Sequence, residues 1–93
     1  MPSRRSSKKE PTTWPEDPDH EFVASFLGIL KEERAAKGWT VRMVGERAGI
    51  DNGIVTRGEN LDRIPGIIVL RKWVRALELD WVEVYRRAEK KNG

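Results

Sequence analysis

The sequence has no cysteine and only one histidine, His20. Disulfides, zinc–thiolate sites and thiol catalysis are therefore excluded, and one chain cannot assemble a histidine-based metal cluster or catalytic triad. It also lacks a glycine-rich phosphate loop and any run of about 18 apolar residues, so no membrane span is expected. The basic N-terminus is not followed by an apolar stretch, unlike a secretion signal. We expect a cytoplasmic protein with no cofactor, no metal, no membrane contact and no enzymatic activity.

The 93 residues are enough for one small domain. Their 38% hydrophobic and 35% charged content is typical of a soluble domain with a small core. The net charge of +3 arises from 18 Lys and Arg against 15 Asp and Glu, and residues 61–93 carry all of this excess. Such a distribution allows a polyanionic partner but does not require one.

Residues 1–20 are predicted to form a disordered tail, which leaves 21–90 as the folded domain. The tail holds most of the prolines and has Trp14 as its only large apolar residue, so it cannot bury enough surface to offset its ordering entropy. Two interpretations remain open. The tail is either simply solvated, or its basic arm, with Arg4 and Arg5, contacts a phosphate backbone.

The pattern from residue 20 onward is helical. Apolar side chains recur at three- and four-residue spacing in Phe22, Val23, Phe26, Leu27 and Leu30. This spacing predicts a helix over 20–37, capped by Asp19 and ended by Gly38.

Four further helices are predicted. The second runs from 41 to 48 after the N-cap Thr40, and the third is capped by Asp51 or Asn52 and runs to about 59. Pro65 suits the first turn of the fourth helix, whose apolar stripe is Ile67, Leu70, Trp73, Val74 and Leu77. A capping box of Asp80 and Glu83 opens the fifth helix, with Trp81, Val84, Tyr85 and Ala88 on its buried side. The expected fold is all-α with five helices.

Residues 41–60 carry the functional signal. Two short helices are separated there by Gly49, which can adopt the positive φ that a sharp turn needs. Gly45, four positions earlier, is a small residue where two steeply crossing helices come closest. The inward apolar residues are Val44, Ala48, Ile50 and Val55. This pattern is typical of a helix-turn-helix.

From Arg34 to Leu77 the chain resembles, without a gap, the lambda-repressor-like, Cro-type helix-turn-helix domains. The matching positions are Arg34, Gly38, Trp39, Thr40, Ala48, Gly49, Ile50, Val55, Glu59, Pro65, Leu70, Ala76 and Leu77. The resemblance covers residues 22–88. It implies a five-helix, lambda-repressor-like DNA-binding domain whose third helix, over about 51–59, reads the major groove.

The sequence departs from the family pattern at several positions. Val41 stands where the family often has Gln, and Gly45 stands where Ala is usual. Gly58 replaces a buried apolar residue, and Leu61 replaces a common Gly. Because Gly53 and Gly58 each cost about 1 kcal/mol relative to Ala within a helix, we expect the third helix to fray in the free protein.

The resemblance also implies which residues contact DNA. Those expected at base edges are Asn52, Gly53, Ile54, Thr56 and Arg57. Asn can bind adenine and Arg can bind guanine through two hydrogen bonds, each worth about 1–3 kcal/mol of discrimination, and Ile54 can meet a thymine methyl. Phosphate contacts, which fix the register, are expected from Thr40, Val41, Arg42 and Asn60. Phosphates would repel Asp51 unless its carboxylate is committed as the helix cap.

The first functional hypothesis is a sequence-specific, double-stranded DNA-binding transcription regulator, of the small phage, prophage or bacterial repressor type. A homodimer formed through the fifth helix, near Trp81 and Tyr85, would suit it. Two alternatives remain open. One is a protein-interaction module on the same fold, an antitoxin or anti-repressor with a regulatory protein partner. The near-neutral charge of residues 21–60 favours it. The other is a recombination accessory protein of the excisionase type.

Overall fold

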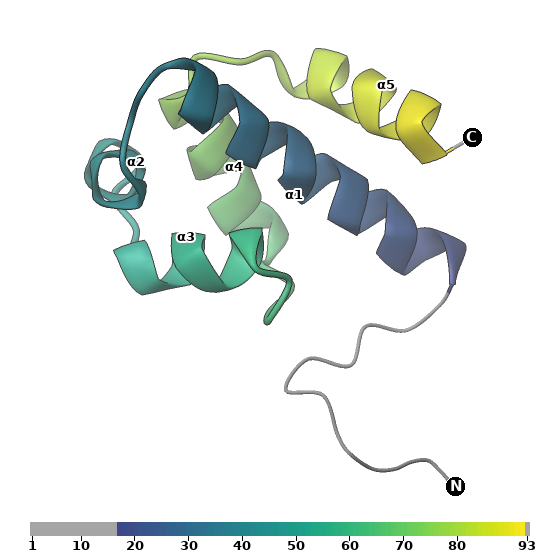
Figure 1. Cartoon of the computed structure of the whole chain (residues 1–93), viewed down its shortest axis with the longest axis horizontal. Coiled ribbons are helices and arrows are strands. Elements are labelled where there is room, and N and C mark those ends of the chain that lie inside the picture. The colour runs from purple at the N-terminus through teal and green to yellow at the C-terminus, as the bar shows by residue number, and fades with distance from the viewer. Residues whose placement is uncertain (1–16, 93) are drawn as a thin grey trace, which may run out of the picture.

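Five helices make up the computed structural model, which describes residues 17–92. They are α1 (Pro18–Ala36), α2 (Val41–Ala48), α3 (Asn52–Glu59), α4 (Ile67–Ala76) and α5 (Trp81–Asn92). Figure 1 shows α5 lying along α1, with α2, α3 and α4 grouped near the C-terminal end of α1. The all-α, five-helix prediction is confirmed. The predicted basic arm, with Arg4 and Arg5, lies outside the described residues.

Helix α1 begins two residues earlier than the sequence predicts, because Asp17 rather than Asp19 is its N-cap. One carboxylate oxygen of Asp17 accepts hydrogen bonds from the backbone N–H groups of Asp19 (2.8 Å) and His20 (3.1 Å), and its other oxygen lies 2.9 Å from Nδ1 of His20. These interactions, led by the backbone bond from His20, hold the pKa of Asp17 below its ordinary value. Pro18 takes the first helical position, where its missing N–H costs nothing.

The predicted bounds of α2 and α3 are confirmed. Thr40 caps α2, since its hydroxyl accepts a hydrogen bond from the N–H of Met43 at 3.1 Å. Asp51 caps α3 by accepting the N–H of Gly53 at 2.6 Å. Helix α3 is continuous to Glu59, and its fraying in the free protein stays a prediction.

Helix α4 differs from the prediction at its start. Pro65 lies outside the helix, Gly66 is the N-cap, and the first helical residue is Ile67. The buried residue in this region is Pro65, whereas Ile67 is 58% exposed. The prediction that Ile67 belongs to the apolar stripe of α4 was therefore wrong, because the turn leading into α4 brings Pro65 rather than Ile67 to the core.

Helix α5 begins with half of the predicted capping box. The N–H of Glu83 donates to the carboxylate of Asp80 at 3.0 Å. Val84 and Ala88 are buried as predicted, but Tyr85 is 46% exposed, so its expected burial was wrong. It lies at the rim of the α1–α5 contact, where its ring meets that of Phe22 at a centroid distance of 5.0 Å.

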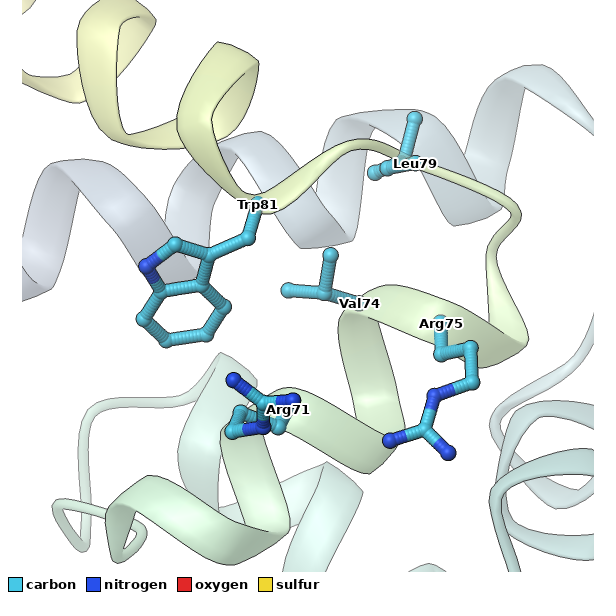
Figure 2. Close-up of a pocket in the computed structure, with 5 residues that line it drawn as sticks. All are labelled: Arg71, Val74, Arg75, Leu79 and Trp81. Atoms are coloured by element: carbon cyan, nitrogen blue, oxygen red, sulfur yellow. The ribbon is translucent and has the colours of Figure 1, made fainter.

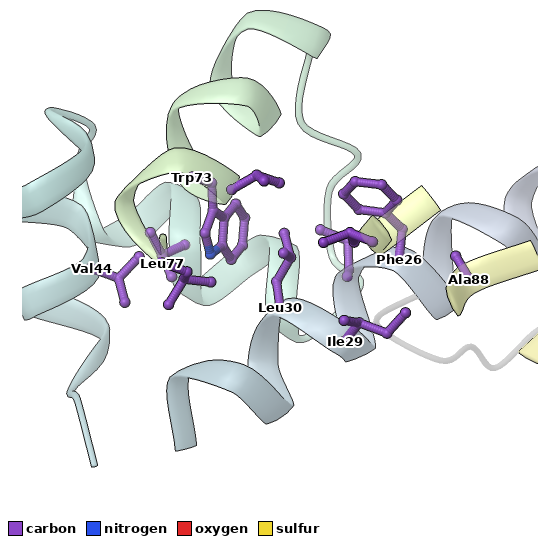
Figure 3. Close-up of a cluster of buried hydrophobic side chains, with 11 residues drawn as sticks. Phe26, Ile29, Leu30, Val44, Trp73, Leu77 and Ala88 are labelled. Carbon is purple, nitrogen blue, oxygen red and sulfur yellow. The ribbon is translucent and has the colours of Figure 1, made fainter. Parts of the chain in front are cut away.

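The core joins residues from all five helices (Figure 3). It comprises Phe26, Leu27, Ile29, Leu30, Val44, Val55, Trp73, Val74, Leu77, Val84 and Ala88. Trp73 is its largest fully buried side chain. A Cβ atom placed on Gly58 would lie 2.9 Å from Cζ3 of Trp73, so the indole ring fills the space that this glycine leaves open. The ring replaces the apolar side chain that α3 lacks there.

Candidate nucleic-acid interface

The turn between α2 and α3 depends on two glycines. Gly49 has φ of 72°, in the left-handed region, and its N–H donates to the carbonyl of Gly45. The N–H of Ile50 donates to the same carbonyl at 3.0 Å. A Cβ atom on Gly45 would lie 2.9 Å from the carbonyl oxygen of Ile50, closer than side chains normally allow. The start of α3 therefore crosses α2 at a point where only glycine fits without a shift.

Helix α3 buries one side and exposes the other. Val55 is fully buried, whereas Asn52, Thr56 and Arg57 are exposed. In the described part of the chain, the side chains of Asn52 and Arg57 form no hydrogen bond or ion pair, while the hydroxyl of Thr56 donates to the carbonyl of Asn52 at 3.1 Å. The other two predicted base-contacting residues, Gly53 and Ile54, are half-buried. The outward face of α3 thus offers polar groups free for a ligand.

Arg57 folds back over the first turn of α3. A Cβ atom on Gly53 would lie 3.2 Å from Nη1 of Arg57 and 2.9 Å from the capping carboxylate of Asp51. The glycine therefore leaves room for the guanidinium beside the N-terminus of the helix. That end carries the positive pole of the helix dipole and is already capped by the carboxylate of Asp51, so the guanidinium of Arg57 supplies the positive charge there that is not paired within the described residues.

The start of α2 carries two of the predicted phosphate-contacting residues. Thr40 is exposed, and its hydroxyl hydrogen remains available although the oxygen accepts the bond from Met43. The side chain of Val41 packs against the core, so this residue can offer a phosphate only its backbone N–H. Because the first N–H groups of a helix have no partner within it, that N–H suits an anion.

Two further predicted phosphate-contacting residues within the described chain, Arg42 and Asn60, are both exposed. Nε of Arg42 lies 3.1 Å from the carboxylate of Glu46, one turn further along α2. Exposed pairs of this kind contribute about 0.3–0.5 kcal/mol, so a phosphate could displace the glutamate. Asn60 is the C-cap of α3, and its N–H donates to the carbonyl of Thr56 at 3.0 Å. Both assignments to phosphate stay predictions.

An ion pair that the sequence analysis missed holds α3 against α1. Nε and Nη2 of Arg34 donate to the two carboxylate oxygens of Glu59 at 2.7 and 3.0 Å, and Nη1 donates to the carbonyl of Trp39 at 2.8 Å. The carboxylate of Glu59 is 5% exposed. Its hydrogen bonds are the main reason that the pKa of Arg34 is raised. Both residues match the family pattern, but local spacing cannot reveal a contact across 25 positions.

Metal binding and membrane insertion find no support in the described structure. Among residues 17–92, no group of three or more acidic or histidine side chains could hold a metal ion. No helix within the same residues is long and apolar enough to cross a membrane.

Comparison with known proteins agrees with this geometry. A family model described as helix-turn-helix matches residues 30–84, which is more than half of the chain. The crystal structure of the wild-type restriction-modification controller protein C.Esp1396I is similar to this fold, with a TM-score of 0.70. The match covers 75% of this chain and 90% of the controller protein at 20% sequence identity, so it concerns the fold alone. No curated protein matches the sequence.

Proposed function

The chain belongs to the Cro-type helix-turn-helix family, and from this premise we propose that it is a sequence-specific regulator of transcription that binds double-stranded DNA. The family supports a DNA-binding transcription regulator. In our proposal α3 enters the major groove and α2 lies across the phosphate backbone, as in other helix-turn-helix proteins. The proposal includes no catalytic step.

One observation carries the assignment of α3 as the reading helix. Its exposed side presents an amide, a hydroxyl and a guanidinium from Asn52, Thr56 and Arg57, opposite the buried Val55. Such side chains can form hydrogen bonds with the donors and acceptors by which base pairs differ in the major groove. Ile54 offers an apolar contact to a thymine methyl. Gly53 lets the backbone approach a base once the guanidinium of Arg57, which lies over it, moves onto the DNA.

The residues around this face are suited to contacts with the DNA phosphate backbone rather than with the bases. Thr40 and the backbone N–H of Val41 lie at the N-terminus of α2, and Arg42 and Asn60 are exposed. Contacts of this type set the register and contribute most of the salt dependence of binding. Arg4 and Arg5, outside the described residues, belong to the same proposal as further phosphate contacts.

We further propose a small repressor of phage, prophage or bacterial type that binds as a homodimer. Two copies reading half-sites about 34–36 Å apart would explain how one short α3 reaches useful affinity. Helix α5 is the proposed contact between the copies, because Val82 and Tyr85 expose 52% and 46% of their surface. Trp81 is half-buried against Phe26, so it would contribute only its outer edge.

The test is selection of binding sites from random duplex DNA, followed by mobility-shift titrations over a range of salt. The selected site should bind more tightly than random duplex at every salt concentration. Asn52→Ala and Arg57→Ala should each lose about 1–3 kcal/mol of discrimination at one base pair. Lys31→Ala is the matched control, since it removes an exposed positive charge from α1.

Two results would contradict the proposal. If no duplex is preferred even at low salt, the protein does not read sequence. If Arg57→Ala and Lys31→Ala weaken binding equally, attraction by net charge explains the affinity. Recovery of one stoichiometric protein partner with no DNA retained would instead support the protein-interaction module, and strong DNA bending would support the recombination accessory role.

A further inference from the structure

The outer face of α4 carries positive charge that is not neutralised. Arg71, Lys72 and Arg75 are exposed there, and within residues 17–92 none of them forms an ion pair. The cations that do pair with a glutamate lie elsewhere, and they are Arg34, Arg42, Arg87 and Lys91. An unpaired cluster of this density attracts a negatively charged partner.

Two adjoining hollows lie on either side of Arg75. The first, of about 140 Å³, is lined by Arg71, Val74, Arg75, Leu79 and Trp81 (Figure 2). The second has a similar volume of about 140 Å³, lies between α4 and the end of α2, and is lined by Arg47, Ala48, Lys72, Arg75 and Ala76. Because Arg75 lines both, one bound chain could occupy the two hollows together.

The first hollow has an apolar floor and a charged rim. Figure 2 shows Val74 surrounded by the ring of Trp81 and the guanidinium groups of Arg71 and Arg75. Trp81 is held in place by Phe26, at a centroid distance of 5.0 Å. The hollow can therefore accept an apolar side chain and place a carboxylate within reach of two arginines.

One rim residue of the second hollow, Arg47, is held in position before any ligand binds. The guanidinium carbon of Arg47 lies 4.3 Å from the ring centroid of Trp39, a cation–π contact. Since this contact already restricts the arginine, binding a carboxylate costs less side-chain entropy than at a mobile cation.

The size of the two hollows and the apolar floor of the first one select the partner. Small-molecule sites usually measure about 300–1,000 Å³, so each hollow suits a single side chain rather than a metabolite. A phosphate backbone would use the cations but leave the apolar floor unfilled. Ile67 and Ile68, 58% and 66% exposed, precede Arg71 and Lys72 by one turn and extend the apolar part of the same face.

We propose that the outer face of α4, together with the last turn of α2, docks an acidic segment of another protein. Its carboxylates bind Arg71, Lys72 and Arg75, and an apolar side chain enters the hollow floored by Val74 and Trp81. The surface uses none of the α3 residues assigned to base contacts, so a regulator could hold DNA and this partner at once.

The test uses a short fluorescein-labelled peptide that combines aspartate and glutamate with leucine and phenylalanine, titrated with the full chain and followed by anisotropy. Arg71→Gln/Arg75→Gln should weaken binding about tenfold or more, because two charge-assisted contacts are lost. The matched control, Lys31→Gln/Arg63→Gln, removes the same charge from exposed positions on α1 and in the segment after α3 and should change the affinity less than about twofold. Polyglutamate of equal charge should bind clearly more weakly than the mixed peptide.

A second measurement locates the peptide. The indole N–H resonance of Trp81, assigned with Trp81→Phe, should shift on peptide addition, while the affinity of Arg71→Gln/Arg75→Gln for duplex DNA should stay unchanged. The proposal is overturned if the mixed peptide fails to bind, if polyglutamate binds equally well, or if both double variants lose equal affinity. Loss of DNA binding in Arg71→Gln/Arg75→Gln would assign the face to the phosphate backbone. Altered self-association would assign it to a second copy of the chain.

Discussion

At the scale of single residues, the side chain of Trp73 packs directly on the backbone of Gly58 within the core. Gly58 has no side chain, and the indole of Trp73 comes within the distance at which a Cβ atom would stand. The ring is fully buried, and its Nε1 has no hydrogen-bond partner among the described residues. The ring therefore gains dispersion contacts that an open gap beside the glycine would lose.

Gly58→Ala should destabilise the protein by about 1–3 kcal/mol, because the new methyl group would meet a rigid, buried ring. Gly28→Ala is the matched control, since a Cβ at this position in α1 would meet nothing within 4 Å. The control should stabilise the protein by about 0.5–1 kcal/mol through helix propensity. Urea unfolding measures both, and equal effects of the two substitutions would contradict the packing of Trp73 on Gly58.

Two residues other than glycine adopt left-handed backbone conformations, Leu61 with φ of 62° and Glu78 with φ of 61°. The family commonly has glycine at the first of these positions. Leu61 recovers part of the cost by packing against the core, whereas Glu78 is exposed and follows the C-cap of α4. The strain at Glu78 is therefore not offset by burial.

Glu78→Gly should raise the free energy of unfolding by about 1 kcal/mol, since glycine adopts this conformation without the steric cost. Glu78→Ala removes the same carboxylate but keeps the Cβ atom, so it should give no comparable gain. Thermal unfolding of the two variants side by side checks the prediction. An equal gain in both would attribute the effect to charge instead.

At the scale of helices, the position of α3 depends on its C-terminal end. The two-bond contact between Arg34 and Glu59 joins the ends of α1 and α3, and the third bond of the guanidinium, to the carbonyl of Trp39, includes the segment before α2. Arg34 thus fixes how α1, α3 and the segment before α2 lie relative to one another. Helix α3, which we propose reads the DNA, is therefore positioned by a residue that would itself contact no DNA.

Glu59→Gln should lower the free energy of unfolding by about 2–3 kcal/mol, because Arg34 would lose a buried, charged partner. Arg34→Lys should also destabilise the protein, since an ammonium group cannot reproduce the planar, two-bond geometry. Hydrogen exchange should show the largest loss of protection in α3 and a smaller loss in α5. A uniform loss across all helices would mean that the pair contributes to global stability without positioning α3.

The first turn of α1 should respond to acid through Asp17. Because the pKa of this carboxyl is lowered in the folded protein, its contribution is complete above the ordinary value of 3.8 and is lost as the pH falls through the lower folded value. Below that pH the N-cap bonds to Asp19 and His20 should weaken. The amide chemical shifts of these two residues, followed by acid titration, check this, and Asp17→Ala should abolish the transition.

At the scale of the whole molecule, the packing of α5 along α1 completes the core. Val84 and Ala88 are fully buried, and Trp81 covers Phe26. Two ion pairs flank this contact, Arg87 with Glu33 and Lys91 with Glu32. Because they are only partly buried or exposed, they add little stability beyond that of the apolar contact. The other four helices need α5 to exclude water from α1.

A chain that ends at residue 80 should therefore fail to fold, whereas one that ends at residue 89 should remain folded. The longer chain keeps all of the buried side chains of α5 and loses the exposed pair of Lys91, worth less than about 1 kcal/mol. Circular dichroism and the dispersion of amide resonances distinguish the two chains. Native-like dispersion in the shorter chain would show that α1 to α4 form a sufficient core.

Much of this architecture could be predicted from the sequence because its signals are local. Helix periodicity, the caps Thr40 and Asp51 and the positive φ of Gly49 each depend on residues within one or two turns. The same local pattern places Val55 inward, and it follows that Asn52 and Arg57 face outward. The exposed face of the candidate site was therefore predictable, although its DNA contacts remain predictions.

The tertiary structure decided the features that join distant parts of the chain. Trp73 fills the space at Gly58, Arg34 binds Glu59, and Pro65 rather than Ile67 reaches the core. The basic hollows on α4 also exist only where α2 and the turn before α5 pack beside it. Side-chain spacing along one helix does not contain this information, because which face is covered depends on how the other helices cross it.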